Sequence, residues 1–248
     1  MLEKIFGSIP NLGICGDNGL FYKYPEMTEF KQLVKNEDKS WRETALKIMN
    51  VFCERTEGSC IIEKKSSIIF SYQNIDNYFG YEQADELKSH LSTILNSPNI
   101  DIVTLNSGSL EIRSKYVNKG AFLARVLQDK YLEKRFDLIF TVGQDDTDEE
   151  MFKYLKSAVK YFNNFVSKCK IVSTTITKHI SHANYYFNEV NDCIENLEYI
   201  IKIRNKEVSE GKNILSNSFK KRDSGAINVK KYEYSGPIFN FNDEEEEK

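Results

Sequence analysis

The acidic segment that follows Gly143 is the part of the sequence best suited to chemistry. An apolar run ends at Val142, and five acidic residues follow between positions 145 and 150. Carboxylates in the first turn of a helix are stabilised by the helix dipole, so the segment could simply begin a helix. The alternative is a hard-cation site at the carboxyl end of a parallel strand, where α/β folds place ligands. The sequence leaves both interpretations open.

A second group of polar residues lies upstream of this segment. Lys119 begins a predicted helix shortly after a predicted strand that carries Glu111 and Arg113. A lysine at such a position can reach a phosphoryl oxygen and offset its negative charge. The charged run 55–65, which includes Lys64, lies on a predicted hairpin and could hydrogen-bond the hydroxyls of a sugar. Taken alone, these residues fit a solvated surface and the rim of an edge strand equally well.

The cysteine and histidine contents argue against several common types of site. The five cysteines are odd in number and form no Cys-x-x-Cys pair. A disulfide framework or a structural zinc site is therefore not expected. We expect a reducing, cytoplasmic location instead. The sequence contains three histidines, which is a poor supply for a Ser-His-Asp triad.

The overall charge and hydropathy exclude two classes of partner. The 248 residues include 34 Lys and Arg and 37 Asp and Glu, so the net charge is −3 and no global field favours nucleic acid or a membrane surface. No uncharged apolar run approaches the roughly 18–20 residues that a membrane helix needs. The first residues include Glu3 and lack an apolar segment, so no signal peptide is expected. We therefore expect neither nucleic acid nor membrane among the partners.

The elements that must position these residues begin with residues 41–117, which read as helix, hairpin, helix, hairpin. The first helix carries apolar residues from Trp41 to Phe52 at spacings of three and four, and the second lies over residues 84–95. This order predicts a small α+β unit with a mostly antiparallel sheet. The strands are expected at 59–62, 66–73, 101–105 and 110–113.

From Lys119 the rhythm changes to strands separated by single helices, which is typical of parallel βαβ units. After about Ile203 the composition becomes polar and ends in an acidic run, which indicates a disordered tail. That acidic end reads as solvated charge, with a docking tail as the alternative. Helices are expected at 119–134 and 148–166, and strands at 136–142 and 171–176. A final helix has the apolar stripe Phe187, Val190, Ile194, Leu197 and Ile201.

A series of short motifs runs in order along the first 200 residues or so. They are Gly16–Phe21, Arg55–Ser59, Glu63-Lys64, Tyr72-Gln73, Phe79-Gly80, Gln83–Leu87, Leu110–Arg113, Lys119-Gly120, Gly143–Phe152 and Ser181–Tyr186. Together they resemble the trehalose-6-phosphate phosphatases, and in particular the phosphatase-like C-terminal half of eukaryotic trehalose-phosphate synthase/phosphatase proteins. The set is specific because many elements occur in the right order, although no single motif would suffice.

This resemblance implies an α/β fold: a haloacid-dehalogenase-like (HAD-like) Rossmannoid core with an inserted α+β cap. The cap agrees with the element order of the middle region. The core would be partial, because its first strands are missing. The implied organisation is a first core part at 1–40, the cap at 41–117, a second core part at 118–202 and the polar tail at 203–248.

The resemblance also implies which residues would contact the substrate. Enzymes of the family remove phosphate from trehalose 6-phosphate through an aspartyl-phosphate, in which a carboxylate attacks a phosphoryl group whose charge is neutralised by a metal and a lysine. Lys119 matches the lysine that binds the phosphate. Lys64, Glu111 and Arg113 match positions of the cap that bind the sugar.

The implied cofactor is Mg²⁺, and its motif is altered in this sequence. Asp148 matches the second aspartate of the metal-binding motif, and Gln144 stands where the family has the first. A glutamine offers one neutral oxygen in place of an anion, so attraction for a divalent cation falls. The neighbouring Asp145 is a secondary candidate ligand.

Further departures concern the nucleophile and the cap. Met1 falls beyond the family's first two core strands, so the nucleophilic Asp-x-Asp-Gly-Thr motif is expected upstream. The Asp-x-Asp at 146–148 lacks the Gly-Thr and enters a helix. In the cap, Ile62, Ser71 and Gln73 replace a glutamate, a histidine and an arginine of the family.

Three hypotheses for the protein follow. The third, a small α/β domain unrelated to the family, makes no statement about function. The first is a trehalose-6-phosphate phosphatase domain that acts in trehalose biosynthesis once an upstream segment supplies the nucleophile. The second is a non-catalytic, regulatory or scaffolding domain of a trehalose-phosphate synthase, with the synthase domain in cis or in trans. The changes at Gln144 and Ile62 favour the second hypothesis, and the absent nucleophile predicts that this chain by itself is inactive.

Overall fold

The computed structural model divides the chain into two compact units. The first contains residues 1–139 and 143–171, and the second contains residues 140–142 and those from 172 onward. Parts of the predicted helices 119–134 and 148–166, and most of the predicted tail, lie outside the described residues. The structure describes residues 1–35, 38–131, 136, 138–161, 169–176, 180–210 and 230–231.

The N-terminal part of the first unit is a small antiparallel sheet, in the order β1-β2-β3, preceded by helix α1. A tight 3-10 turn, η1, joins β1 to β2, and its residues Asp17, Asn18 and Gly19 all have positive φ. Gly19 is required there, because a Cβ atom would overlap the Cβ atom of Phe122. The elements are α1 (Leu2–Phe6), β1 (Ile14–Gly16), η1 (Asp17–Gly19), β2 (Phe21–Lys23) and β3 (Lys31–Gln32).

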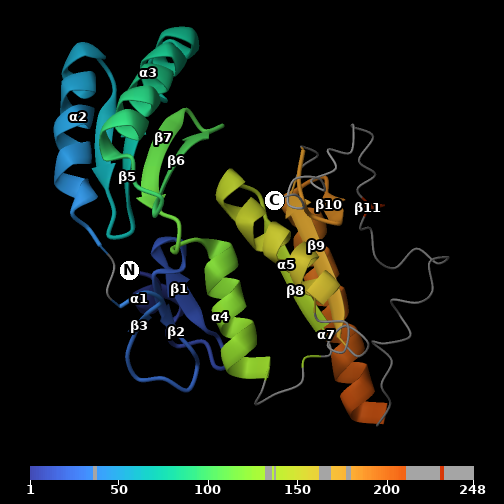
Figure 1. Ribbon diagram of the computed structural model, residues 1–248. Helices are drawn as coiled ribbons and strands as arrows, with labels where there is room; N and C mark the ends of the chain where they lie inside the picture. Colours follow the sequence, from blue (N-terminus) through green and yellow to red (C-terminus); the bar gives the residue numbers. More distant parts are fainter. Residues whose placement is uncertain are drawn as a thin grey trace, which may run out of the picture. The chain divides into compact units, whose positions relative to one another are not determined.

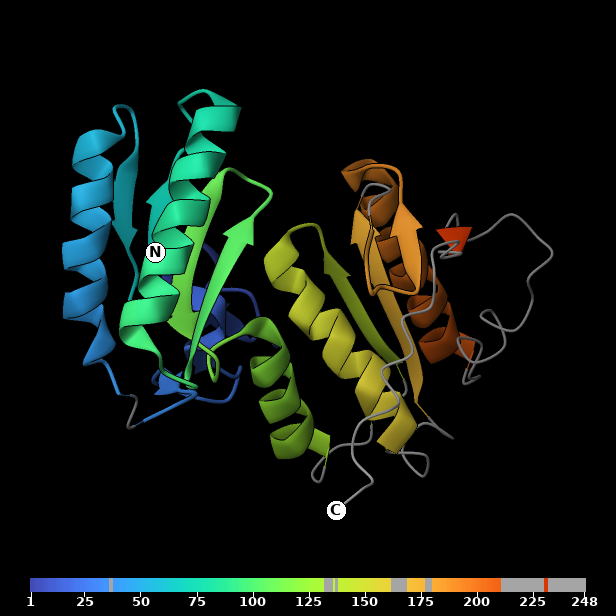
Figure 2. The same cartoon turned by 45° about the horizontal axis from the view of Figure 1, so that its top comes forward.

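The middle of the first unit confirms the predicted alternation of helices and hairpins. Its four strands form one antiparallel sheet in the order β4-β5-β7-β6, and α2 and α3 lie side by side on it (Figures 1 and 2). The boundary of this region at residue 117 stays a prediction. The elements are α2 (Trp41–Arg55), β4 (Cys60–Glu63), β5 (Ser67–Ser71), α3 (Asn77–Leu95), β6 (Ile100–Leu105) and β7 (Ser109–Ser114).

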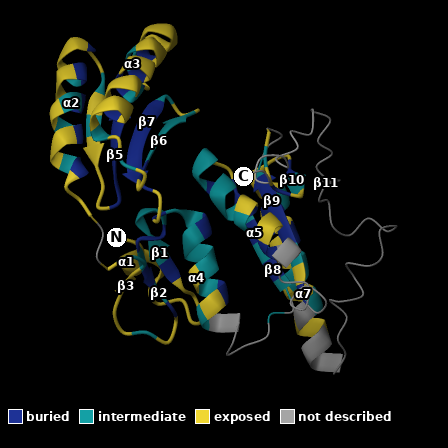
Figure 3. Ribbon diagram, viewed as in Figure 1, coloured by how far each residue is buried: buried dark blue, intermediate teal, exposed yellow. Residues whose placement is uncertain are grey.

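The core of this region lies between the two helices and the sheet. Trp41, Ala45, Met49 and Phe52 of α2 are buried at the predicted spacing of three and four residues, and Ile68, Phe70, Leu110 and Ile112 supply the sheet side. Figure 3 shows β5 and β7 as buried throughout, whereas the outer faces of α2 and α3 are exposed. The opposite face of the same strands carries the polar residues of the candidate site.

Local signals fix the ends of α3. The Asp76 carboxylate accepts hydrogen bonds from the backbone N–H groups of Tyr78 and Phe79, which otherwise lack helical partners. At the other end, Asn96 adopts the left-handed conformation and Pro98 follows. The helix therefore starts seven residues earlier than the apolar spacing at 84–95 indicates, because that spacing registers the packed face and not the capped first turns.

The remainder of the first unit packs α4 against α5. Leu127, Ile139, Leu155 and Cys169 form a small apolar cluster. Gly120 in the first turn of α4 allows the close approach, because a Cβ atom there would overlap the carbonyl oxygen of Glu150. The elements are α4 (Lys119–Tyr131), β8 (Leu138–Gly143), a short 3-10 turn η2 (Asp146–Asp148) and α5 (Glu149–Tyr161).

A third sheet has the order β11-β10-β9-β8, and its strands β9 and β10 are parallel. Strand β10 was not expected from the sequence, because three residues are too few to show a pattern. The helix α7 continues past the predicted start of the tail at residue 203. The elements are β9 (Lys170–Ile176), β10 (Tyr185–Phe187), α7 (Val190–Glu210) and β11 (Lys230–Lys231).

The predicted apolar stripe of the last helix is wrong as a packing face. Phe187, the first residue of the predicted stripe, is buried but lies in β10, outside the helix. Val190, Ile194, Leu197 and Ile201 are 40% to 58% exposed, whereas Cys193 and Asn196 are buried. Regular spacing shows that apolar side chains share one face of a helix, but it does not show that the chain covers that face. In the described residues, no helix combines the length and the apolarity that crossing a membrane requires.

Candidate functional site

Lys119 and Asp148, both singled out by the sequence, form an ion pair. Nζ of Lys119 lies 2.6 Å from Oδ1 of Asp148. The other oxygen, Oδ2, accepts the backbone N–H groups of Gln144 at 2.9 Å and Asp145 at 3.1 Å. Asp148 is 8% exposed and the Lys119 side chain is one-third exposed. Both carboxylate oxygens are therefore engaged by donors from this chain.

The local sequence places Asp148 in this position. Asp145 and Asp148 form a reciprocal capping box, in which each side chain accepts the backbone N–H of the other. Gly143 lets the chain fold back tightly, because a Cβ atom there would overlap the Cβ atom of Asp148. The capping interpretation of the acidic segment is therefore confirmed for these two residues.

Lys119 is positioned by the residue before it. The side-chain oxygen of Asn118 accepts the N–H of Ala121 at 2.7 Å, as expected of a helix N-cap. Its amide nitrogen donates to the carbonyl oxygen of Lys115 at 3.0 Å. These two bonds anchor the first turn of α4 to the end of the preceding strand, and thereby fix the direction from which Lys119 approaches Asp148.

Asp146, between the two capping residues, is tied to the turn that joins β6 to β7. Its carboxylate accepts two hydrogen bonds from Asn106, one from the backbone N–H and one from the side-chain amide, both at 2.8 Å. This contact joins residues 40 positions apart, and no local sequence signal indicates it. Within the described residues, no group of three or more His, Cys, Asp or Glu side chains is arranged to hold a metal ion.

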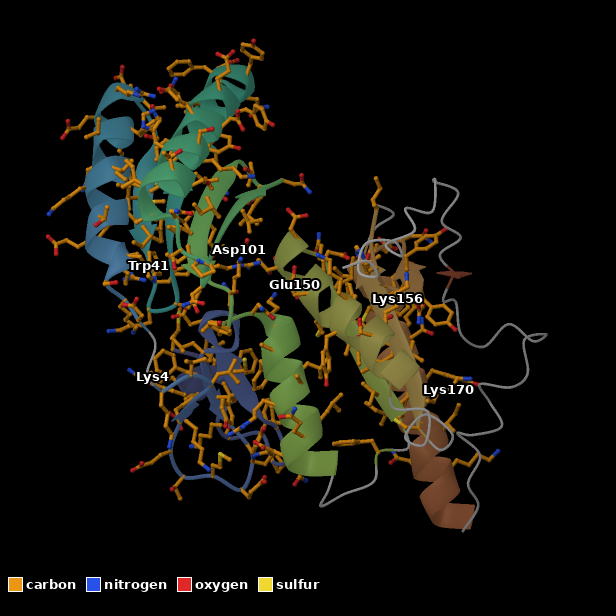
Figure 4. All side chains as sticks on the ribbon, in the orientation of Figure 1. Lys4, Trp41, Asp101, Glu150, Lys156 and Lys170 are labelled. Atoms are coloured by element: carbon orange, nitrogen blue, oxygen red, sulfur yellow. The ribbon has the colours of Figure 1, made fainter. Side chains whose placement is uncertain are left out.

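Glu111 and Arg113 form a second polar cluster on β7. Glu111 is 1% exposed, and its Oε1 accepts a hydrogen bond from the Ser67 hydroxyl at 2.7 Å. Its Oε2 lies 3.6 Å from Nη1 of Arg113 and has no hydrogen-bond partner among the described residues. Nη2 of Arg113 lies 3.5 Å from the carboxylate of Asp101 on β6, which is labelled in Figure 4.

The η1 turn contacts the same sheet. Nδ2 of Asn18 lies 3.4 Å from Oε1 of Glu111. The Asp17 carboxylate accepts the Ser66 hydroxyl at 2.6 Å and the Ser66 backbone N–H at 3.0 Å. These partners were missed at the sequence level. Their one local signal is the Gly16–Gly19 turn, whose composition suits the positive φ that the turn adopts.

Lys64 is not brought to this cluster. It is exposed in the turn between β4 and β5, where its backbone N–H donates to the carbonyl oxygen of Ser67 at 2.9 Å. Its own carbonyl oxygen accepts Nη2 of Arg42 at 2.8 Å. In the described part of the chain, no contact joins the Lys64 side chain to Glu111 or Arg113. Ile62, on the adjoining strand, is also exposed.

The thiol of Cys15 is partly buried and feels the charge of Lys119, and both affect its pKa. Desolvation raises the pKa of this thiol from 9.0 to about 11, and the positive charge of Lys119 opposes the rise. Burial therefore favours the neutral thiol, which keeps its proton at physiological pH.

Comparison with known sequences identifies one family. A family model described as trehalose-phosphatase matches residues 2–215. The probable alpha,alpha-trehalose-phosphate synthase 11 of Arabidopsis thaliana is 30% identical over 202 residues, which are 80% of this chain and 23% of that protein. The trehalose-phosphatase of Schizosaccharomyces pombe is 32% identical over 152 residues, which are 61% of this chain and 17% of that protein. The chain thus spans about a quarter of the length of the Arabidopsis relative.

Comparison with solved structures agrees. The C-terminal domain of trehalose-6-phosphate phosphatase from C. albicans superposes with a TM-score of 0.68 at 26% identity, over 78% of this chain and 71% of that one. The trehalose-6-phosphate phosphatase of Aspergillus fumigatus gives a TM-score of 0.57 at 27% identity, with 78% and 70% covered. The expected α/β, HAD-like fold class is confirmed. The chain belongs to the trehalose-phosphatase family.

Proposed function

We propose that this chain is a trehalose-phosphatase-family domain of trehalose biosynthesis that recognises trehalose 6-phosphate without hydrolysing it. The observation that carries the proposal is the state of Asp148, whose two oxygens are engaged by Lys119 and by two backbone amides. Hydrolysis of a phosphomonoester through a covalent intermediate needs a free carboxylate nucleophile and a cation that neutralises the phosphoryl oxygens. Asp148 matches the family's metal-binding aspartate, and with its oxygens engaged by Lys119 and two amides it is poorly placed to hold the cation that hydrolysis needs.

Recognition of the sugar is assigned to the β7 cluster. Glu111 is buried beside Arg113, and its Oε2 lacks a hydrogen-bond donor among the described residues. A buried carboxylate oxygen without a donor is costly, and a sugar hydroxyl would supply the missing hydrogen bond. Arg113 would donate a hydrogen bond to a further sugar oxygen. The ammonium group of Lys119 would donate hydrogen bonds both to Asp148 and to the phosphate. Lys64 is the weakest member of the proposed set, because its side chain is exposed.

The partner of this domain is proposed from the names of its relatives. Several Arabidopsis relatives are described as trehalose-phosphate synthases, and this chain matches about a quarter of their length. We propose that the domain works with a synthase domain, in the same polypeptide or in another, and that it does so in the cytoplasm. Its role there would be to report the level of the sugar phosphate.

The test combines binding and turnover. Isothermal titration of the chain with trehalose 6-phosphate is expected to show saturable binding that trehalose and inorganic phosphate alone do not reproduce. Glu111→Gln should weaken binding by about fivefold, the equivalent of one hydrogen bond of about 1 kcal/mol. Glu43→Gln, at an exposed glutamate of α2, is the matched control and should bind as the unmodified chain does.

Each outcome decides between the candidate functions. Phosphate release that Asp148→Asn abolishes would contradict the proposal and establish hydrolysis, the second candidate, which is favoured by the retention of Lys119 at the start of α4. Absence of both binding and release would also contradict it, and would leave scaffolding as the function. Binding without release is the result that the proposal predicts.

A further inference from the structure

The carboxylates of the three aspartates at the start of the acidic segment, Asp145, Asp146 and Asp148, all take part in hydrogen bonds within this chain. Asp145 accepts the backbone N–H of Asp148, and Asp146 accepts two hydrogen bonds from Asn106. Asp148 itself accepts hydrogen bonds from three donors. Phosphatases of this fold generally use Mg²⁺, which requires near-octahedral oxygen ligands, several of them carboxylates or waters. The residues described here do not fit that requirement.

Electrostatics at Asp148 point in the same direction. The ammonium group of Lys119 lies 2.6 Å from Oδ1 of Asp148 and is its ion-pair partner among the described residues. A divalent cation at Asp148 would have to displace this ammonium group or lie beside it. Two positive charges a few ångströms apart repel each other, and the repulsion is stronger where water is partly excluded, as at Asp148, which is 8% exposed.

Gln144 removes the charge that would offset this repulsion. Its side chain is exposed at the end of β8, and its backbone N–H is committed to Asp148. An aspartate at this position would add one negative charge directly before the capping box. The neutral amide of Gln144 adds no negative charge. The carboxylates of Asp145, Asp146 and Asp148 already have hydrogen-bond or ion-pair partners within the chain.

We propose that Lys119 is the resident counter-cation of this site and that Gln144 is the residue that excludes a divalent metal from it. The inference rests on the proposed function, because it concerns the same site. Its consequence is that the chain binds its phosphorylated ligand equally well with Mg²⁺ and with a chelator. Phosphatase-family domains with this pair of residues would then form a class whose phosphate site is independent of metal.

Binding of Mn²⁺, a spectroscopic substitute for Mg²⁺, tests the proposal without any activity assay. Electron paramagnetic resonance measures the free ion as the full chain is added. We expect no saturable binding up to about 1 mM Mn²⁺. Gln144→Asp is expected to create a site that binds Mn²⁺ at least about tenfold more tightly, and the double variant Gln144→Asp/Lys119→Met should bind more tightly still.

A matched control separates a local effect from a general gain of charge. Gln32→Asp adds one carboxylate on the exposed strand β3 and should leave Mn²⁺ binding as weak as in the unmodified chain. The proposal is wrong if the unmodified chain binds Mn²⁺ with a dissociation constant below about 0.1 mM and Asp148→Asn abolishes that binding. It is also wrong if Gln144→Asp, shown to be folded by circular dichroism, behaves like Gln32→Asp.

The two proposals fail separately. Release of phosphate from trehalose 6-phosphate in the presence of a chelator would overturn the proposed function and leave the metal exclusion intact. Tight Mn²⁺ binding without turnover would overturn the metal exclusion and leave the proposed function intact.

Discussion

Asn106 donates two hydrogen bonds to the carboxylate of Asp146, one from its backbone N–H and one from its side-chain amide, each at 2.8 Å. Asn106 lies in the turn between β6 and β7, and Asp146 lies in the η2 turn that leads into α5. The contact joins the antiparallel sheet of the first unit to the segment that holds Lys119 and Asp148. It lies at an exposed position, so it contributes to the orientation of these parts more than to overall stability.

We therefore predict a measurable but small coupling between these two residues. Asn106→Ala should lower the free energy of unfolding by about 1 kcal/mol, because one side-chain hydrogen bond to a charged group is lost. In a double-mutant cycle with Asp146→Ala, urea denaturation should give a coupling energy of about 0.5–1 kcal/mol. A coupling energy indistinguishable from zero would mean that the hydrogen bonds between Asn106 and Asp146 do not persist in solution.

A second prediction concerns Gly143, which permits the fold-back of Asp148. Gly143→Ala should destabilise the protein by about 2 kcal/mol, because the new methyl group overlaps the Asp148 side chain and something must shift. Gly13→Ala is the control, since a Cβ atom there meets its nearest neighbour at 3.5 Å, an ordinary contact. Thermal denaturation compares the two variants, and equal losses would show that the overlap is not the cause.

The buried pair on β7 leads to a third prediction. Glu111→Ala should lower the free energy of unfolding by about 3 kcal/mol, because among the described residues it leaves the buried guanidinium of Arg113 with the partly exposed Asp101 as its remaining ion-pair partner. Glu43→Ala, on the exposed face of α2, should change stability by less than about 0.5 kcal/mol. Urea denaturation measures both. A small loss for Glu111→Ala would contradict the buried position of this carboxylate.

The raised pKa of Cys15 leads to a prediction about pH. Because burial raises the pKa of the thiol from 9.0 to about 11, the folded state keeps its proton at a pH where the unfolded state has lost it. The contribution of Cys15 to stability is therefore complete below about pH 9 and declines as the pH rises toward 11. Urea denaturation at several pH values should show this decline, and Cys15→Ala should reduce it. An unchanged decline in Cys15→Ala would assign it to other groups.

Much of the fold could be predicted from the sequence because its signals are local. The spacing of Trp41, Ala45, Met49 and Phe52 identifies the packed face of α2, and the alternation of helices and hairpins identifies the antiparallel sheet. Lys119 and Asp148 were found because they lie in short motifs that resemble those of the family. Each of these inferences depends on residues that are close together in the chain.

The rest could not be predicted because it depends on tertiary contacts. Asn18, Ser67 and Asn106 contact the candidate residues from positions 40 to 93 residues away, and no local pattern indicates such pairs. The predicted packing face of α7 is wrong for a related reason. Spacing identifies a face of the helix, but only the assembled fold determines which face is covered.

The most direct test of the central claim is a phosphate-release assay on the unmodified chain with trehalose 6-phosphate and Mg²⁺. If Asp148 is held by Lys119 and by the amides of Gln144 and Asp145, the rate should equal that of a blank without protein, and Asp148→Asn should change nothing. A rate above the blank that depends on Mg²⁺ and disappears in Asp148→Asn would contradict the account.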